Sequence, residues 1–481
     1  MRLSGLDLTI LMLYLAAVTA IGLWFRRGQR DIRDYFLGRR ESPWWALTLS
    51  IVATETSTLT VVSTPALAFA ENFQFLQLVL GYVAGRVVVA LLFIPQFFRG
   101  EFYTAYQLIE TRFGARMKSV AAATFLITRA LADGVRIAAV ALVVQVAFGI
   151  GELWSVVIVL GLTLIYTFHG GLKAVIWTDV VQLGIYLGGA LAALGLLLGK
   201  IPGGWSEASA VAAAHGKFQL FDFTWDWTTK YTFWSGVLGG MFLTMASHGT
   251  DQLMVQRLLA ARSERDSKRA LLASAVLVFA QFALFLLLGV LLFVFYGAPA
   301  TTPGQSYDAV FPQFIVQEMP AGLRGLMLAA IFAAAMSTTS STLNALASSS
   351  IVDFRRLQGK ITEPTRLLSL SRRATLVWGA VLLLLGLVRW GPLLEAGLTI
   401  ASITYGSLLG LFVLGFLHRG ATAGGALTGM FAGLAGMLYV RFATPVAWTW
   451  YVLVGTLTTV LVGVAVSWVT RQATAQHKER S

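Results

Sequence analysis

The sequence predicts an all-α polytopic membrane protein with about 13 transmembrane helices. Of its 481 residues, 57% are hydrophobic and only 12% are charged. A soluble globular chain carries about 25% charged residues. The mean hydropathy is +0.73, and apolar segments of roughly 20 residues, the length that crosses a bilayer, account for most of the chain. These observations argue against a water-soluble enzyme and against a disordered chain.

Apolar segments follow one another along the chain, separated by polar or charged loops. We predict helices over residues 6–25, 43–70, 73–98, 119–148, 152–168, 175–199, 231–256, 270–296, 323–352, 373–389, 392–417, 422–440 and 446–470. The first segment lacks a basic region beyond Arg2 and a small-residue cleavage site, so we interpret it as a retained helix and not a signal peptide. The longest polar stretches, about residues 200–229 and 353–372, are loop-sized, so no appended soluble domain is expected.

Positive charge is concentrated in one set of alternating loops. Twenty-six of the 36 Lys and Arg residues lie in that set, Lys173 and Arg257 among them, and seven lie in the opposite set. Because basic loops stay on the cytoplasmic side, we expect a multi-pass protein of the cell membrane (inner or plasma) with its N-terminus outside and its C-terminus in the cytoplasm. The net charge of +13 is then a topology signal, and no nucleic-acid partner is expected.

Residues that could carry enzymatic chemistry are scarce. The chain has no cysteine, which excludes disulfides, thiolate catalysis and cysteine-ligated metals. Its five histidines show no metal-ligand spacing such as HExxH, and there is no nucleophile–base motif. We therefore expect a protein that is not an enzyme, with no cofactor and no obligate protein partner.

Two of the predicted spans contain polar runs typical of broken helices. Residues 54–58 are all polar and cover every face of a helix, which a lipid-facing helix cannot tolerate. In the seventh span, three glycines precede the polar run 247–252. Interrupted helices in corresponding positions of two halves indicate a transporter site. The alternative for residues 54–58 is an intact helix buried inside the bundle.

The ninth span carries a row of hydroxyl side chains. Ser337, Ser341 and Ala334 share one helical stripe, and Thr338 and Ser340 flank it. Hydroxyl rows in membrane helices most often hold neighbouring helices together. The functional alternative is coordination of a small hard cation, which prefers several oxygen ligands.

Ionisable residues inside the predicted spans are also candidates for function, because their burial in hydrocarbon costs at least a few kcal/mol. They include Arg86, Arg129, Arg136, Glu55, Asp133, Asp179 and Asp251. Asp133 lies four residues after Arg129 and three before Arg136, so we expect these three on one helix face as a mutually neutralised row. Each residue can instead form a structural ion pair, for Asp179 with a nearby base such as Lys173.

Three motifs together resemble the sodium:solute symporter family, which includes sodium–glucose, proline, sialic acid and multivitamin transporters. They are GGLKAVIWTDVVQ at residues 170–182, TDQLMVQR at residues 250–257, and the stretch 336–344. The resemblance covers roughly residues 5–420. It implies a five-plus-five inverted-repeat core, like that of the leucine transporter, with one leading and two trailing helices.

The resemblance also implies how the chain divides. Residues 1–481 would form a single membrane transport domain. Its parts would be a leading helix over 5–25, a first repeat over 43–199, a second repeat over 231–417, and two trailing helices over 422–470.

Site residues follow from the same resemblance, position by position. The main sodium site would use the carbonyls of Ala53, Thr56 and Ala334 and the hydroxyls of Ser337 and Thr338. A second sodium, bound in some members of the family, would use Asp179, Ser337, Ser340 and Ser341. The substrate pocket would involve Glu55, Ser57, Thr60, Phe75, Val79, Arg129 and Thr399. The chain departs from the family at Val79, which is polar in sugar and sialic acid carriers, and at Glu55, which is neutral in glucose carriers.

These features predict a sodium-coupled symporter that imports a small polar organic solute by alternating access, with the bilayer, sodium and the solute as its partners. The combination of Glu55 with Arg129 favours a carboxylate-bearing or zwitterionic solute, because a guanidinium binds a carboxylate through two parallel hydrogen bonds. The alternatives are a sugar symporter of the same family and a membrane solute sensor that does not transport.

Overall fold

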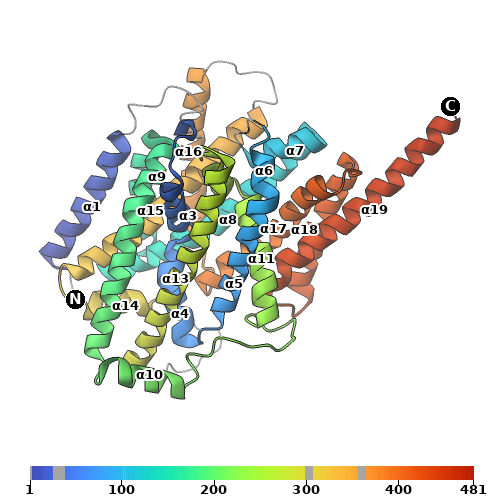
Figure 1. Cartoon of the computed structure of the whole chain (residues 1–481). Helices are drawn as coiled ribbons and strands as arrows, with labels where there is room; N and C mark the ends of the chain where they lie inside the picture. Colours follow the sequence, from blue (N-terminus) through green and yellow to red (C-terminus); the bar gives the residue numbers. More distant parts are fainter. Residues whose placement is uncertain are drawn as a thin grey trace.

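The structure, a computed structural model, describes residues 3–24, 38–100, 102, 104–297, 307–355 and 364–480. Within these ranges the regular structure is helical, apart from an isolated bridge between Ser42 and Ala261. The start of α1 and the end of α19 lie at opposite ends of the bundle (Figure 1). The loop arginines Arg26, Arg27, Arg30 and Arg33 lie outside the described residues.

The helices follow the predicted apolar segments closely. In chain order they are α1 (Gly5–Trp24), η2 (Gly38–Arg40), α3 (Trp44–Glu55), α4 (Thr58–Ala70), α5 (Phe75–Val88), η3 (Val89–Phe93), α6 (Ile94–Phe97), α7 (Ala105–Phe113), α8 (Ala115–Phe148), α9 (Glu152–Lys200), α10 (Gly204–Ala214), α11 (Phe233–Gly249), α12 (Gln252–Leu259), α13 (Glu264–Tyr296), α14 (Val310–Glu318), α15 (Leu323–Ser349), η4 (Ser350–Arg355), α16 (Pro364–Gly386), α17 (Leu393–Leu417), α18 (Ala423–Ala443), η6 (Trp448–Trp450) and α19 (Tyr451–Arg480). The all-α prediction is confirmed.

The apolar helices include many that can cross a membrane. Among the described residues, eight are long and apolar enough to do so, and the bent pair α3–α4 makes a ninth. Shorter apolar helices, Gly5–Val18 and Glu152–Gly161, accompany them. The chain is therefore a multi-pass membrane protein.

The predicted spans over 152–168 and 175–199 are joined without a gap in the helical backbone. Both belong to α9, a helical stretch of 49 residues. A straight helix of that length would measure about 74 Å, more than twice the thickness of the hydrocarbon core. Val175–Lys200 is long enough to cross by itself. Gly170 and Gly171 do not end the helix because a glycine inside a helix costs only about 1 kcal/mol.

Both predicted helix breaks are confirmed. Helix α3 ends at Glu55, α4 begins at Thr58, and their axes differ by 59°. Threonine hydroxyls stabilise this end, because Thr56 Oγ1 donates to the carbonyl of Val52. Helix α11 ends at Gly249, and α12 begins at Gln252.

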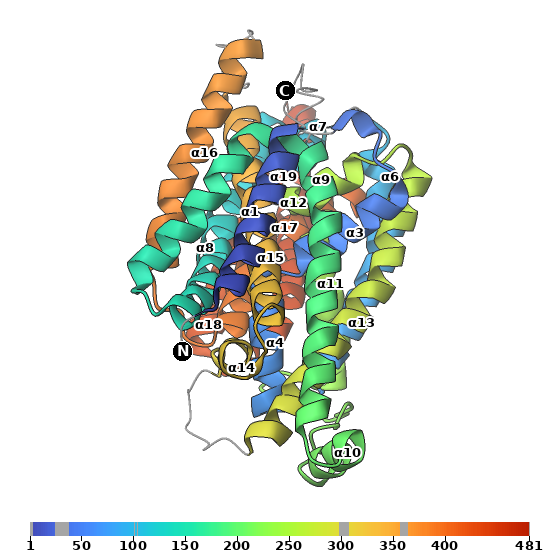
Figure 2. The ribbon, with the colours of Figure 1, turned by 90° about the vertical axis from the view of Figure 1, so that its left-hand side faces the viewer.

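The broken pair α3–α4 lies in the interior of the bundle. Helix α3 packs against α9, α13 and α15, and α4 packs mainly against α13. In α15, 94% of the most apolar 18-residue stretch is buried inside the protein. Helices α1 and α9 pack on this helix (Figure 2). The serine and threonine row of α15 therefore faces protein and not lipid.

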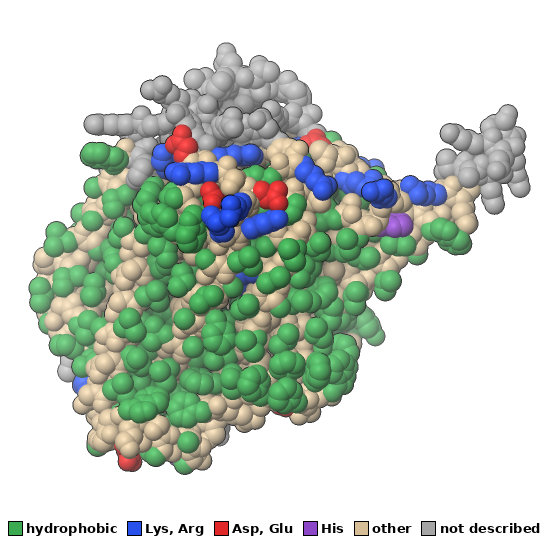
Figure 3. Space-filling model, in the orientation of Figure 1, with side chains coloured by type: hydrophobic (Ala, Val, Ile, Leu, Met, Phe, Trp, Pro, Cys, Tyr) green, Lys and Arg blue, Asp and Glu red, His purple; other side chains and the backbone are tan. Residues whose placement is uncertain are grey.

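Charge is distributed unevenly over the surface. Lys and Arg side chains form a band at the end of the bundle where α7 lies and toward which α19 runs (Figure 3). Below this band, hydrophobic side chains cover most of the visible face. On this face the positive charge is concentrated at one end of the bundle, as the unequal distribution of Lys and Arg between the two sets of loops predicts.

Helices α5 and α11 cross at very short range, which requires glycine on both sides. A Cβ atom on Gly240 would lie 2.2 Å from the carbonyl oxygen of Leu78, and one on Gly81 would lie 2.5 Å from that of Val237. We expect Gly240→Ala to force the helices apart and destabilise the protein by about 1–3 kcal/mol. The melting temperature of the purified protein in detergent measures this effect.

Gly195→Ala is the matched control, because this helical glycine of α9 has no atom within 4 Å of its ideal Cβ position. We expect its melting temperature to stay at the wild-type value or to rise slightly, since alanine favours helix. Equal melting temperatures for the two variants would contradict the close crossing.

Candidate functional site

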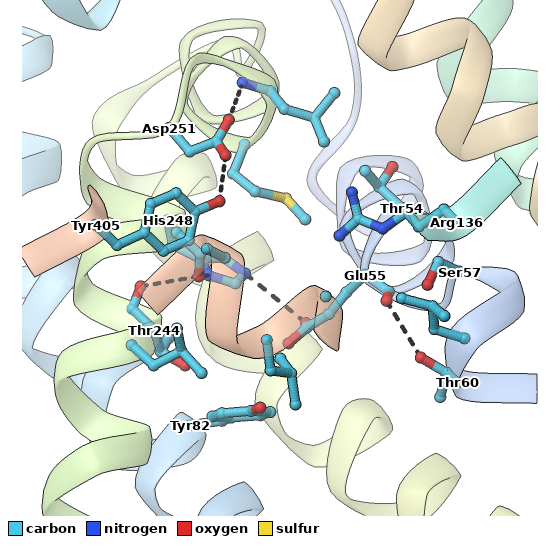
Figure 4. Close-up of a pocket in the computed structure, with 18 of the residues that line it drawn as sticks. Thr54, Glu55, Ser57, Thr60, Tyr82, Arg136, Thr244, His248, Asp251 and Tyr405 are labelled. Atoms are coloured by element: carbon cyan, nitrogen blue, oxygen red, sulfur yellow. Dashed lines mark hydrogen bonds and ion pairs between the residues drawn. The ribbon is translucent and has the colours of Figure 1, made fainter. Parts of the chain in front are cut away.

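A cavity of about 120 Å³ lies where the two broken helices meet (Figure 4). Glu55, at the end of α3, reaches into it from one break, and His248 and Asp251 reach into it from the other. Side chains of α4, α5, α8, α13 and α17 complete the wall. The cavity therefore joins the parts of the chain whose polar runs predicted interruptions.

The structure brings together most of the residues expected to contact solute. Glu55, Ser57, Thr60, Phe75 and Arg129 line the cavity. The two remaining candidates lie outside its described lining: Val79 is fully buried within α5, and Thr399 is half-buried on α17, two residues before the lining residue Ala401.

Sequence reasoning did not assign several lining residues to the pocket. They include Tyr82, Arg136, His248, Asp251 and Tyr405. The charges of Arg136 and Asp251 inside predicted spans were a usable signal, and His248 lies in the polar run of the seventh span. Tyr82 and Tyr405 gave no such signal, because an aromatic residue in an apolar helix is ordinary.

Glu55 has a buried positive partner behind the cavity. Arg86 Nη2 forms an ion pair with Glu55 Oε2, and the guanidinium also donates to Ser274 Oγ (3.2 Å) and to the carbonyl of Tyr82 (3.2 Å). The Arg86 side chain is fully buried, while that of Glu55 is 15% exposed. Glu55 is therefore a neutralised carboxylate that still faces the cavity.

The charged row on α8 forms as the sequence predicts. Arg129 Nη2 lies 3.1 Å from Asp133 Oδ1, and Arg136 also pairs with Asp133. Arg129 is additionally bound by Asp251 (3.3 Å) and Thr342 (3.2 Å).

The two arginines differ in how exposed they are and in how many of their N–H donors are already used. The side chain of Arg136 is 23% exposed and that of Arg129 only 5%. The Nε atom of Arg136 is buried and has no hydrogen-bond partner among the described residues. Of the two, Arg136 therefore keeps the greater capacity to bind a further acceptor.

The residues expected at the main sodium site come from two helices that pack together, α3 with its break and α15. All five are buried: Ala53, Thr56, Ala334, Ser337 and Thr338. Thr56 Oγ1 lies 2.7 Å from Gln281 Oε1, and Thr338 Oγ1 donates to the carbonyl of Ala334 (3.1 Å). Gln281 belongs to α13 and the second bond lies within α15, so what brings the two groups of expected ligands near each other is the packing of α3 on α15.

The residues expected at the second sodium site lie around Asp179. Its carboxylate accepts from Ser337 Oγ and from Ser50 Oγ (2.5 Å). Ser340 Oγ donates to the carbonyl of Ser337 (3.0 Å). The environment of Asp179 is therefore rich in hydroxyl groups.

The positive partner of Asp179 is Arg257, which corrects two expectations. Arg257 Nη2 lies 3.1 Å from Asp179 Oδ2 and 2.9 Å from Ser341 Oγ. The sequence placed Arg257 in a cytoplasmic loop, but α12 continues to Leu259 and Arg257 is buried. The other base considered for Asp179, Lys173, pairs instead with Glu41 at 3.3 Å.

The second break is tied to the short helix α7. The amide of Ala105 donates to Gln252 Oε1 (2.8 Å), and the hydroxyl of Tyr106 donates to the carbonyl of Thr250 (3.1 Å). Thr104 Oγ1 donates to Asp353 Oδ1 (3.1 Å) in η4. These bonds connect the cavity wall to the basic end of the bundle.

Comparison with known proteins places this arrangement among transporters. The model of the "Sodium:solute symporter family" matches residues 35–433. The human sodium/iodide cotransporter is 32% identical over 450 residues, which cover 90% of this chain and 69% of that protein. The sodium/sialic acid symporter of Proteus mirabilis is 30% identical over 469 residues, covering 95% and 94% of the two chains.

Solved structures share the fold. A substrate-bound, outward-open Na+-coupled sialic acid symporter matches with a TM-score of 0.89 at 30% identity, over 97% of this chain and 98% of that one. The nucleobase-cation-symport-1 transporter Mhp1 matches with a TM-score of 0.60 at 15% identity, over 91% and 94%. The fold is thus of the leucine-transporter type.

The Glu55–Arg86 pair gives a prediction about stability. Arg86→Met leaves the carboxylate of Glu55 buried without its counter-charge, so we expect a loss of about 3–5 kcal/mol. Adding Glu55→Gln should restore most of the lost stability, because the uncompensated charge is then gone. Melting temperatures of the single and double variants measure both effects.

Lys173→Met is the control, because it breaks an exposed ion pair with Glu41. We expect less than about 1 kcal/mol from it. If the Arg86→Met variant and the double variant melted at the same temperature, Arg86 would not act through Glu55.

Proposed function

Because this chain belongs to the sodium:solute symporter family and is a sodium-coupled membrane transporter, not an enzyme, we propose that it imports a small carboxylate-bearing or zwitterionic solute. The observation that carries the choice of solute is the cavity at the two helix breaks, with Glu55, Arg129 and Arg136 in its wall. Transport would proceed by alternating access.

The finer architecture is part of the proposal. We propose 13 spans, arranged as a leading helix (5–25), two inverted repeats (43–199 and 231–417) and two trailing helices (422–470). The breaks in α3–α4 and α11–α12 support the repeat, because each lies in the first span of its half. The band of Lys and Arg side chains supports a cytoplasmic C-terminus and an N-terminus outside (Figure 3).

We propose that one sodium ion binds between the break of α3 and the hydroxyl row of α15. Its ligands would be the carbonyls of Ala53, Thr56 and Ala334 and the hydroxyls of Ser337 and Thr338. Neutral oxygen ligands suit this hard cation, and the two helices pack directly against each other.

A second ion would require a rearrangement around Asp179. Its ligands would be Asp179, Ser337, Ser340 and Ser341. In the structure the guanidinium of Arg257 already neutralises this carboxylate and contacts Ser341. In the conformation described here we therefore propose a single bound sodium, and a second ion only where Arg257 leaves Asp179.

The charge of the cavity supports a monovalent anionic or a zwitterionic solute. Two acidic residues (Glu55 and Asp251) and two arginines (Arg129 and Arg136) belong to its described lining. A wall without net charge accommodates best a cargo without net charge: a zwitterion is neutral by itself, and a monovalent carboxylate is neutral together with one sodium ion. The names of similar proteins fit this chemistry: they include sodium/iodide, sodium/sialic acid and sodium-coupled monocarboxylate transporters.

Coupling follows from the position of the broken helix. Its end supplies Ala53 and Thr56 to the proposed ion site and Glu55 and Ser57 to the cavity. An ion that fixes the geometry of the break therefore also fixes the wall against which the solute binds. Ion and solute shift the protein between its two orientations only if they bind one orientation better, by several kcal/mol for a nearly complete shift.

Thr338→Ala tests the ion site. It removes one oxygen ligand, so we expect the sodium concentration for half-maximal stabilisation to rise at least about tenfold, equivalent to about 1.4 kcal/mol. Sodium titrations of the melting temperature, with choline as the replacement cation, measure this change. Thr339→Ala is the control, because it makes the same change one position further along α15. An unchanged sodium dependence in Thr338→Ala would remove the assignment.

Substitutions in α8 test the solute class. Lysine keeps the charge of arginine but cannot copy its two-pronged hydrogen bonding, so Arg136→Lys and Arg129→Lys should each weaken carboxylate binding about tenfold or more. The measurement is calorimetric titration with whichever of lactate, propionate and alanine stabilises the wild-type protein most in sodium.

Asp133→Asn is the comparison, because it releases both arginines from their common partner. We expect it to lower the melting temperature more than either lysine variant. Normal binding by Arg129→Lys would make Arg129 structural and leave Arg136 as the anion-binding residue; normal binding by both variants would remove the carboxylate proposal.

A further inference from the structure

His248, in the wall of the cavity, has a nitrogen atom that faces Glu55 and is not used in any hydrogen bond among the described residues (Figure 4). The imidazole is 1% exposed, and its Nε2 atom has no hydrogen-bond partner among the described residues. Nε2 lies 3.8 Å from Glu55 Oε2, too far for a direct hydrogen bond. The other ring nitrogen, Nδ1, lies 2.9 Å from Ser247 Oγ. Only Nε2 is therefore open to a ligand.

Glu55 restricts which chemical groups can bridge these two side chains. Glu55 is paired with the buried guanidinium of Arg86, so it is held as a carboxylate, which only accepts hydrogen bonds. Any atom placed between Glu55 and His248 must therefore donate to Glu55. A group without an N–H or O–H leaves the carboxylate of Glu55 without that bond.

The tautomer of His248 decides which donor fits best, but not whether one is needed. With the proton on Nδ1, Nε2 is an acceptor, and the bridging group must donate twice, as an ammonium or amide nitrogen can. With the proton on Nε2, the bridging group accepts from His248 and donates to Glu55, as a hydroxyl can. Both cases require a donor on the solute.

We propose that Glu55 and His248 form a subsite that selects solutes carrying an N–H or O–H donor in addition to a carboxylate. The inference rests on the proposed function, because the carboxylate would bind at the arginines of α8. It narrows the solute class to hydroxy acids and amino acids and assigns to His248 a part in specificity. Sites built to hydrogen-bond a polar group discriminate strongly against analogues that lack the group.

The test uses four probes with the same three-carbon carboxylate. Propionate has no donor at its second carbon, L-lactate has a hydroxyl, and L-alanine has an ammonium. The fully N-methylated betaine of alanine keeps the positive charge but has no N–H. For the wild-type protein in sodium, we expect lactate or alanine to bind at least about tenfold more tightly than both propionate and the betaine.

Two substitutions of His248 separate specificity from structure. The side-chain amide of glutamine reaches the position of Nε2, whereas that of asparagine reaches only the position of Nδ1, where Ser247 is bound. We expect His248→Gln to keep most of the preference for the donor-bearing probe and His248→Asn to lose it. Calorimetric titration measures affinity, and the melting temperature shows that each variant is folded.

The possible results are distinct. Equal affinity of the wild-type protein for propionate and its donor-bearing analogues overturns the subsite while leaving the carboxylate proposal standing. A preference kept by His248→Asn and lost by His248→Gln also overturns it, since His248 would then act through Ser247. Sodium-dependent binding of glucose, with none of the four carboxylates bound, overturns the proposed function and this inference with it.

Discussion

Between Glu55 and Thr58 the polypeptide stops following the axis of α3 and turns by 59° into α4, inside an apolar bundle. A helix that ends there leaves backbone groups without helical partners, and in this setting water cannot satisfy them freely. Hydroxyl groups stabilise the end of α3, as Thr56 does by bonding to Val52. The cavity wall and the proposed ion site both depend on this interruption, because both use residues within three positions of it.

Charge neutralisation is the second constraint. A carboxylate or guanidinium buried alone in this bundle would cost several kcal/mol. The described structure pairs Glu55 with Arg86, Asp179 with Arg257, and Asp133 with Arg129 and Arg136. The row around Asp133 lies within α8, whereas the other two pairs connect different helices, α3 with α5 and α9 with α12. Among the described residues that line the cavity, His248 and Arg136 each keep a buried nitrogen atom without a hydrogen-bond partner, which a polar ligand can complete.

The sequence could predict those features of the fold and the site that depend on residues close together in the chain. The breaks at 54–58 and 247–252, the hydroxyl row of α15 and the ion pairs on α8 are all visible within a few residues, and the structure has each of them. The pairing of Asp179 with Arg257 joins residues 78 positions apart. Helical spacing relates only residues a few positions apart, so the sequence suggested Lys173, which is nearer in the chain, as the partner of Asp179. Likewise, His248 lies beside Glu55 only because the fold brings the ends of α3 and α11 to the same cavity.

If one broken helix serves the ion and the solute together, the sodium gradient drives solute uptake. The most direct measurement is uptake into proteoliposomes of a radiolabelled solute that shows sodium-dependent binding. We expect accumulation above the external concentration under an inward sodium gradient, and its loss when choline replaces sodium or when the gradient is collapsed. Uptake that stays flat when the gradient is imposed, for every solute that binds, would contradict it.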